Sequence, residues 1–196
     1  MVKYLLMRGD IMSSWLLPDY VFGTYKEITA EFLREIGISA LLIDIDNTLA
    51  PYEMPEPDES IVAWFASLHE NGIKATLVSN NDRERVELFN RDLGLLAYYK
   101  SGKPFAKNLK RAMAAMGSDK TNTAMLGDQL LTDAAAGKHI GLRTIIVPPI
   151  KDKNNAFFRS KRAMEVRHIK KYVRIHGGDA ERICEFWLKK KYKKSR

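Results

Sequence analysis

The feature that most constrains the fold is a four-residue apolar run that ends in two carboxylates. Residues 40–43 read Ala-Leu-Leu-Ile, which indicates a short strand buried on both faces. Asp44 and Asp46 follow it two positions apart, so on an extended chain their side chains point to the same face. In open α/β sheets, ligands bind in the crevice beyond the carboxyl ends of the strands. The run therefore predicts a sheet and also the edge of that sheet where a ligand binds.

Two carboxylates in one crevice repel each other unless a cation or a proton lies between them. Oxygen ligands suit a hard divalent cation, so we expect Mg²⁺ at this edge. The alternative is purely structural: Asp46, Asn47 and Thr48 form a turn and cap the segment that follows. The residues downstream favour the first interpretation.

The rest of the first 150 residues alternates between predicted strands and predicted helices. Strands are predicted at residues 74–79, 95–99, 123–126 and 143–147, and helices at 25–36, 58–71, 82–92, 103–116 and from 132 to 137. Residues 1–20 are expected to be irregular or a short helix over the core. This alternation predicts a three-layer, Rossmann-like α/β domain with a parallel five-stranded sheet.

Polar side chains also follow the later strands, as they follow the first. Ser79 and Asn80 come after the second strand, Lys103 after the third, and Asp128 and Asp133 after the fourth. In a parallel sheet all of them lie at one edge, where four acidic groups suit a cation and a Lys and a Ser suit phosphoryl oxygens. Each has a structural alternative: a helix cap at Ser79 or Asp128, a surface lysine at Lys103, an exposed acid at Asp133. Their joint appearance at strand ends favours a phosphoryl-transfer site.

These residues resemble the four motifs of the haloacid dehalogenase (HAD) phosphatases, in the same order. The resemblance covers roughly residues 24–149, and its motifs are Asp44-x-Asp46-x-Thr48, Ser79, Lys103 and Gly127-Asp128-x₄-Asp133. The spacings leave no room for an inserted cap domain, as in the capless subclass IIIA. Three features are similar to the YqeG-type family, which includes phosphatidylglycerophosphate phosphatases: the leader ending in Gly37-Ile38, the Asp-Asn-Thr-Leu form of the first motif, and Gly-Asp-Gln129 with Thr132-Asp133.

The resemblance implies a role for each motif residue. Asp44 is the expected nucleophile, which forms an aspartyl-phosphate. Asp46 is the expected general acid and base, with a pKa above that of a free Asp, and Thr48 is expected to steady it. Ser79, Asn80 and Lys103 are expected to hold the phosphoryl group. The implied Mg²⁺ ligands are the Asp44 carboxylate, the Asp46 main-chain carbonyl, Asp128, and Asp133 through water.

The charge of the chain is unevenly distributed. Sixteen Lys or Arg and five Asp or Glu lie from residue 150 onward, a net charge of +11, whereas the first 149 residues carry sixteen against nineteen, a net charge of −3. We expect a HAD-like domain at 1–150, with residues 1–37 packed on it as a leader, and a basic helical extension at 151–196. Such asymmetry suggests an anionic partner, a membrane surface or a nucleic acid.

The extension has two interpretations. Val166, Ile169 and Val173 share one helical face flanked by basic residues, and Trp187 follows in a second predicted helix. The segment either lies on an anionic bilayer or packs on the core as a helical hairpin with a solvated end. Cys184 is the single cysteine and no secretory or membrane-spanning segment is visible, so we expect a reducing, cytoplasmic location, with peripheral attachment to the membrane left open.

Three functions remain open on the sequence alone. The first is a Mg²⁺-dependent phosphatase for phosphatidylglycerophosphate at a membrane surface, which the family resemblance and the basic extension favour. The second is a capless phosphatase for a soluble, protein or nucleic-acid phosphoester. The third is an RNA-binding module on a HAD scaffold, which the intact motifs disfavour, because a binding scaffold has no need of Asp46. The sequence does not determine the oligomeric state.

Overall fold

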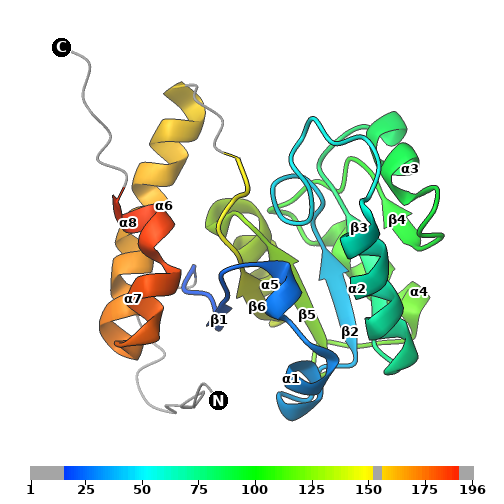
Figure 1. Cartoon of the computed structure of the whole chain (residues 1–196), viewed down its shortest axis with the longest axis horizontal. Coiled ribbons are helices and arrows are strands. Elements are labelled where there is room, and N and C mark those ends of the chain that lie inside the picture. Colours follow the sequence, from blue (N-terminus) through cyan, green and yellow to red (C-terminus); the bar gives the residue numbers. More distant parts are fainter. Residues whose placement is uncertain (1–15, 152–155, 190–196) are drawn as a thin grey trace.

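The computed structural model describes residues 16–151 and 156–189. The described residues form a six-stranded sheet in the order β1-β6-β5-β2-β3-β4, with helices on both faces (Figure 1). Each neighbouring pair of strands is parallel, which confirms the predicted parallel α/β architecture. The strands are β1 (Tyr20–Val21), β2 (Ala40–Ile43), β3 (Lys74–Val78), β4 (Leu96–Tyr98), β5 (Thr123–Gly127) and β6 (Arg143–Ile146).

The prediction of five strands was wrong by one, because a further strand, β1, begins at Tyr20, the last residue of the segment expected to be irregular or helical. At two residues, β1 is too short to leave a hydrophobic period in the sequence. It forms because the edge of β6 offers backbone groups that need partners: Phe22 N donates to the carbonyl of Ile146 at 3.0 Å. Asp19 secures the same edge by accepting the backbone N–H of Thr144 at 2.7 Å.

The helices follow the predicted order but differ from it in three places. One is residues 132–137, which lie across a π-helical turn (Leu130–Ala134) and an α-helix (Ala135–His139) and not in one helix. Residues 25–36 form a 3₁₀ turn η1 (Tyr25–Glu27) and a separate helix α1 (Ala30–Glu35), because the Thr29 hydroxyl caps α1 by accepting the N–H of Phe32. The helix expected from Lys103 begins only at α4 (Lys107–Met116). The others are α2 (Glu59–Glu70), α3 (Arg83–Asn90), the π-helical turn η2 (Leu130–Ala134), α5 (Ala135–His139), α6 (Ala156–His176), α7 (Asp179–Ile183) and α8 (Glu185–Lys189).

Strand β2 lies at the centre of the sheet and is buried along its whole length. Its alternate residues contribute to two separate apolar clusters: Leu41 and Ile43 pack with α1 and α2, whereas Leu42 packs with α4 and α5. The helices therefore cover both faces of the sheet, which makes the three predicted layers. The carboxyl end of β2, where the two aspartates follow, opens between these layers.

Helices α6, α7 and α8 pack beside the β1–β6 side of the sheet (Figure 1). Ile169 of α6 and Trp187 of α8 are buried in a third apolar cluster that includes Val21 and Ile146 of the sheet. The apolar face of this segment is thus covered by the core, as in the hairpin interpretation, and Trp187 is not on a surface that a bilayer reaches. None of the helices within residues 16–151 and 156–189 is long and apolar enough to cross a membrane.

Candidate active site

The end of β2 places the first two carboxylates by means of a tight turn. Asp44 continues the sheet, because its N–H donates to the carbonyl of Leu126 at 2.9 Å. Asn47 then adopts a left-handed conformation with φ of 68°, which Asn tolerates better than most residues, and its N–H donates to Ala50 O at 2.7 Å. The turn that was the structural alternative therefore exists, and it leaves both aspartates at the mouth of the sheet.

Lys103 is the cation at the centre of the site. Its side chain is almost fully buried, and its Nζ lies 2.6 Å from Asp44 Oδ1 and 2.7 Å from Asp133 Oδ1. Asn80 holds the loop that carries it, because the Asn80 amide accepts the N–H of Lys103 and donates to its carbonyl, both at 2.9 Å. Asn80 also lines the cavity, but its side chain holds the lysine loop, a role that the sequence did not suggest.

Asp128 directly follows β5, and Asp133 lies in the π-helical turn η2 that comes next. Asp133 is held by the N–H of Gln129, which donates to its Oδ2 at 3.1 Å. Gly127 makes this approach possible, since a Cβ on that residue would stand 2.3 Å from the Cβ of Asp133. Gly127-Asp128-x₄-Asp133 is thus a single geometric unit, in which the glycine makes room for the second aspartate.

Three carboxylates meet at the centre of the site. Asp44, Asp128 and Asp133 are all buried, and each offers an oxygen within 4.8 Å of those of the other two. Asp128 Oδ1 is buried without a hydrogen-bond partner in the structure. Three carboxylates against the one ammonium of Lys103 leave an excess of negative charge, which suits a divalent cation with oxygen ligands. The residues present therefore fit the expected metal.

Burial also changes the ionisation of these groups. Burial raises the pKa of Asp44 to about 7, although Lys103 opposes the shift. Burial likewise raises the pKa of Asp128 well above its usual range, against the effect of Arg162. Burial alone would lower the pKa of Lys103, but the charges of Asp133 and Asp44 outweigh it and the pKa is raised. The raised pKa values of Asp44 and Asp128 therefore reflect mainly the removal of their carboxylates from water.

Asp46 has different partners, and the sequence did not reveal them. Arg85 of α3 donates from Nε to Asp46 Oδ1 at 3.1 Å, and Asn81 donates from Nδ2 to Asp46 Oδ2 at 3.1 Å. Arg85 also donates to the carbonyl of Pro55 at 2.9 Å, which fixes its position. No spacing in the sequence marks these partners, because Asn81 precedes α3 and Arg85 lies in its first turn, so the two do not share a helical face.

Asp128 also has a partner that the sequence did not reveal, and it comes from α6. Arg162 donates to Asp128 Oδ2 at 2.9 Å, and Glu165 pairs with Arg162 at 2.8 Å. Both side chains are buried. The sequence could not have revealed this pair. An Arg and a Glu three residues apart on a basic helix usually lie on its solvated face, and their spacing does not distinguish a buried pair from an exposed one.

The remaining predicted residues lie at the same place, with some changes of partner. The Thr48 hydroxyl donates to Asp44 Oδ2 at 3.4 Å, so its contact is with the first aspartate and not with Asp46, as the resemblance had suggested. The Ser79 hydroxyl accepts the N–H of Asn81 at 3.0 Å. A cavity of about 330 Å³ opens here. Its lining includes Asp44, Asp46, Ser79, Asn80, Lys103 and Asp133, together with Lys161 of α6.

Comparison with known proteins identifies the family. Residues 21–141 match the haloacid dehalogenase-like hydrolases. The chain belongs to that family. This hydrolase is 36% identical over 157 residues to the probable phosphatase YqeG of Bacillus subtilis (strain 168), covering 80% of its own length and 91% of the relative. It is also 32% identical over 104 residues to the pyrophosphatase PpaX of Halalkalibacterium halodurans, covering 48% of each chain.

Solved structures are similar at lower identity. A putative 3-deoxy-D-manno-octulosonate 8-phosphate phosphatase from Vibrio cholerae has a TM-score of 0.49 and 16% identity, covering 65% of this hydrolase and 74% of that chain. A putative HAD superfamily (subfamily III A) hydrolase from Legionella pneumophila has a TM-score of 0.45 and 16% identity, covering 82% and 95%.

Proposed function

We propose that this HAD-family phosphatase hydrolyses a phosphate monoester through an aspartyl-phosphate on Asp44. The observation that carries the proposal is the convergence of Asp44, Lys103 and Asp133 within 2.7 Å contacts at the wall of an open cavity. Asp44 is buried but borders the cavity, so one face of its carboxylate is within reach of a substrate. Lys103 holds the orientation of that carboxylate and supplies positive charge beside the phosphoryl oxygens.

The proposed reaction has two steps. In the first, an Asp44 oxygen attacks phosphorus, the bond from phosphorus to the alcohol oxygen breaks, and Asp46 gives its proton to the leaving oxygen. In the second, Asp46 takes a proton from a water molecule as that water attacks phosphorus. The bond from phosphorus to Asp44 then breaks, which releases inorganic phosphate and restores both carboxyl groups. In both steps Arg85 and Asn81 hold the Asp46 carboxyl group at the wall of the cavity.

We assign the cation site to Asp44, Asp128 and Asp133, with Mg²⁺ as the expected ion and the main-chain carbonyl of Asp46 as a further ligand. The buried, unpartnered Oδ1 of Asp128 supports this assignment. A bound divalent cation supplies a positive charge that stabilises the charge developing on the phosphoryl oxygens. Ser79 and Asn80 follow β3, the strand beside β2, and both border the cavity. The Ser79 hydroxyl is suited to a phosphoryl oxygen, whereas the Asn80 side chain holds the Lys103 loop.

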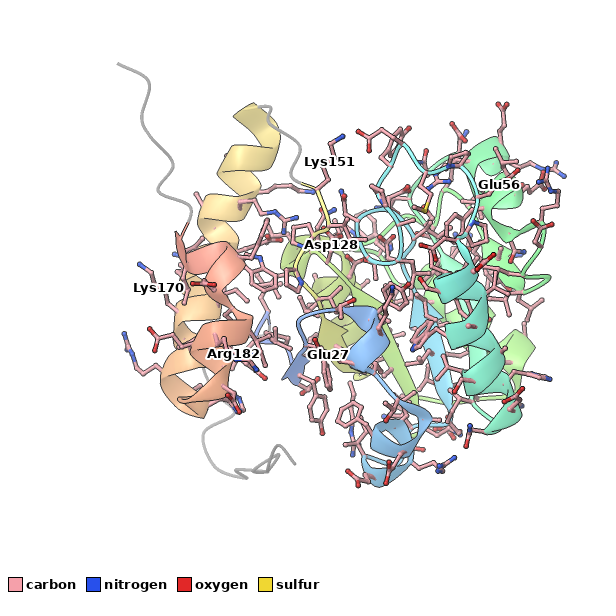
Figure 2. The ribbon with its side chains drawn as sticks, in the orientation of Figure 1. Glu27, Glu56, Asp128, Lys151, Lys170 and Arg182 are labelled. Carbon is pink, nitrogen blue, oxygen red and sulfur yellow. The ribbon has the colours of Figure 1, made fainter. Side chains whose placement is uncertain are left out.

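The proposed substrate is phosphatidylglycerophosphate at an anionic membrane surface, as the similarity to the YqeG-type proteins suggests. Residues 44–73, all described, hold α2 as their sole helix, which supports a capless site open to a large substrate. Arg167 and Lys170 are exposed on α6, and Figure 2 shows Lys170 pointing away from the sheet. With its apolar face buried, α6 would bind a bilayer through charge, which contributes roughly 1 kcal/mol for each Lys or Arg near the surface.

A second candidate is a soluble, protein or nucleic-acid phosphoester. The observation that favours it is the burial of Trp187 and Ile169 in the core, since this removes the apolar contact with lipid that the sequence suggested. On this alternative the exposed basic residues of α6 attract a polyanion in solution. The retained carboxylates disfavour a binding module without catalysis.

The deciding experiment measures Mg²⁺-dependent release of phosphate from phosphatidylglycerophosphate in mixed vesicles, beside p-nitrophenyl phosphate, glycerol 3-phosphate, a nucleoside monophosphate and a phosphoserine peptide. We expect the highest kcat/KM for the lipid, and the Asp44→Asn variant controls for contaminating phosphatases. Equal or higher kcat/KM for a soluble ester would reject the lipid proposal and favour the second candidate. No release from any substrate would reject phosphatase activity.

A second experiment tests whether the exposed basic residues of α6 bind an anionic membrane. Replacing Arg167 and Lys170 by Gln is expected to lower co-sedimentation with anionic vesicles while leaving activity on p-nitrophenyl phosphate unchanged. The matched control replaces Lys107 and Lys110, two exposed lysines of α4, in the same way. Equal losses from both pairs would show that net charge, and not the α6 surface, governs binding.

A further inference from the structure

Helix α6 lies outside residues 21–141, the part that matches the hydrolase family, yet two of its charged side chains reach the aspartate loop of the site. Arg162 is 5% exposed and Glu165 is 1% exposed. Charged side chains are rarely buried to this extent unless they are paired, and a buried pair is weak evidence for stability alone. Their position therefore suggests a role at the loop that they contact. In Figure 2, Asp128 is labelled between the sheet and α6.

The contacts hold the loop at two points. Arg162 donates from Nη2 to Asp128 Oδ2 at 2.9 Å and from Nη1 to the Asp128 carbonyl at 3.2 Å. Glu165 Oε1 accepts the N–H of Leu130 at 2.9 Å and that of Leu131 at 3.4 Å. The two residues are joined by the bond from Arg162 Nη1 to Glu165 Oε2 at 2.8 Å. One buried pair thus fixes both the carboxylate of Asp128 and the backbone just after it.

The two oxygens of Asp128 are used differently. Oδ2 accepts the hydrogen bond from Arg162, whereas Oδ1 is buried without a hydrogen-bond partner. A buried carboxylate oxygen left without a partner is costly, so this arrangement is stable only if another group occupies that side. Arg162 holds one oxygen and leaves the other without a hydrogen bond, in a carboxylate that belongs to the three-carboxylate cluster.

The net charge of Arg162 and Glu165 indicates that they orient Asp128 and do not neutralise it. Arg162 and Glu165 cancel each other, so together they bring hydrogen-bond donors to Asp128 without changing the charge of the cluster. Asp44, Asp128 and Asp133 against Lys103 then keep a formal charge of two negative units, which a divalent cation balances. Without Glu165, Arg162 would act as a competing counter-ion at the same carboxylate.

We propose that Arg162, held by Glu165, is a positioning residue that orients Asp128 for the divalent cation, so that α6 is part of the catalytic unit. The proposal rests on the cation site of the proposed function. It concerns metal affinity, which is measured without substrate and therefore separately from phosphatase activity. Partners that orient a metal ligand typically change metal affinity or activity by about 10- to 100-fold when they are removed.

The test is Mn²⁺ binding to the full-length chain, followed by electron paramagnetic resonance of the free ion, with Mg²⁺ competition. Arg162→Met is expected to raise the Mn²⁺ dissociation constant by about 10- to 100-fold. Arg162→Lys, which keeps one donor and the charge, is expected to recover part of the loss. The matched control is Arg174→Met, an exposed arginine of the same helix, which is expected to bind Mn²⁺ as the unmodified chain does.

If Arg162→Met does not fold, Arg162→Met/Glu165→Gln removes both buried charges and keeps an oxygen that can accept the backbone N–H groups. A folded variant of either kind with unchanged Mn²⁺ affinity overturns the proposal, and a tighter affinity identifies Arg162 as a competitor of the cation. An unmodified chain that binds no Mn²⁺ rejects the cation site itself. Normal binding without phosphate release from any ester rejects only the proposed phosphatase reaction.

Discussion

Asp44 and Asp46 stand two residues apart at the end of one strand, yet their surroundings differ. Asp44 is buried, pairs with Lys103 at 2.6 Å and belongs to the three-carboxylate cluster. The Asp46 side chain is 16% exposed and pairs with Arg85 of α3. Asp44, the inner aspartate, is held by the sheet and its loops, whereas Asp46, the outer aspartate, is held by α3. This division separates a carboxylate suited to attack phosphorus from one suited to move a proton.

The difference arises from the neighbours and not from the aspartates themselves. Both follow β2, and the extended chain alone gives them the same direction. Lys103 comes from the loop before α4, and Arg85 comes from α3, so two separate crossovers of the sheet provide the two environments. Each prediction below alters one member of the pair or its partner.

The largest effect is expected for the inner aspartate. Asp44→Asn removes the nucleophilic oxygen while keeping shape, so turnover should fall by more than about 10⁴-fold, comparable with the loss of nucleophiles in other hydrolases. The measurement is phosphate release, with circular dichroism and thermal melting to verify the fold. A folded variant with near-normal activity would remove Asp44 from the role of nucleophile.

A smaller loss is expected for the outer aspartate. Asp46→Asn removes proton transfer but not the nucleophile, so kcat should fall by about 10²- to 10⁴-fold on an alkyl phosphate. With p-nitrophenyl phosphate, whose leaving group needs no proton, the loss should be smaller. Rates on the two esters are compared under the same conditions. Equal losses on both would contradict the assignment of Asp46 as the acid for the leaving group.

The burial of Asp44 predicts a pH dependence of stability in the metal-free protein. Its pKa is raised from 3.8 to about 7, so its contribution to stability is complete below the unfolded-state pKa and is lost as the pH rises through about 7. Relative to Asp44→Asn, the free energy of unfolding should therefore decrease between about pH 4 and pH 7, by at most about 1.4 kcal/mol per pH unit. Urea unfolding in a chelator measures it.

Added Mg²⁺ should reduce this pH dependence, because a bound cation favours the ionised carboxylate. A constant difference between the two proteins across the same pH range, with chelator present, would contradict the assignment of the shift to Asp44.

The smallest effect is expected for the partner of the outer aspartate. Arg85→Gln breaks an ion pair whose side chains are only 10% and 16% exposed, so the loss of stability should be about 1 to 3 kcal/mol, and kcat should fall less than in Asp46→Asn. A double-mutant cycle sharpens the test: with Asn at position 46, the further change Arg85→Gln should have little effect on kcat. Independent, additive losses would show that Arg85 acts on the substrate and not through Asp46.

Much of the fold and of the site was predictable because local signals repeat at the ends of β2, β3, β4 and β5. The apolar run at residues 40–43 gave β2 with its observed bounds, and the residues after each strand meet at one edge because the sheet is parallel. Asp44, Lys103, Asp128 and Asp133 meet as the sequence predicted. The two-residue strand β1 was not predicted because it depends on pairing with the edge of β6. The break at Thr29 was not predicted because the apolar spacing of residues 25–36 is helical throughout and does not show the cap. Predictions for residues 1–15, 152–155 and 190–196, including the lysine-rich end, lie outside the described residues.

The sequence by itself determined which residue types follow each strand. Because the strands are parallel, it also determined that carboxylates, a lysine and a serine share one edge of the sheet. Only the tertiary structure decided their partners, because hydrogen bonds and burial join residues that are far apart in the chain. Arg85 with Asp46 and Arg162 with Asp128 are 39 and 34 positions apart, respectively, and no local period encodes either pair. Basic residues on a helix are usually solvated, so packing of α6 against the sheet was needed to turn one of them inward.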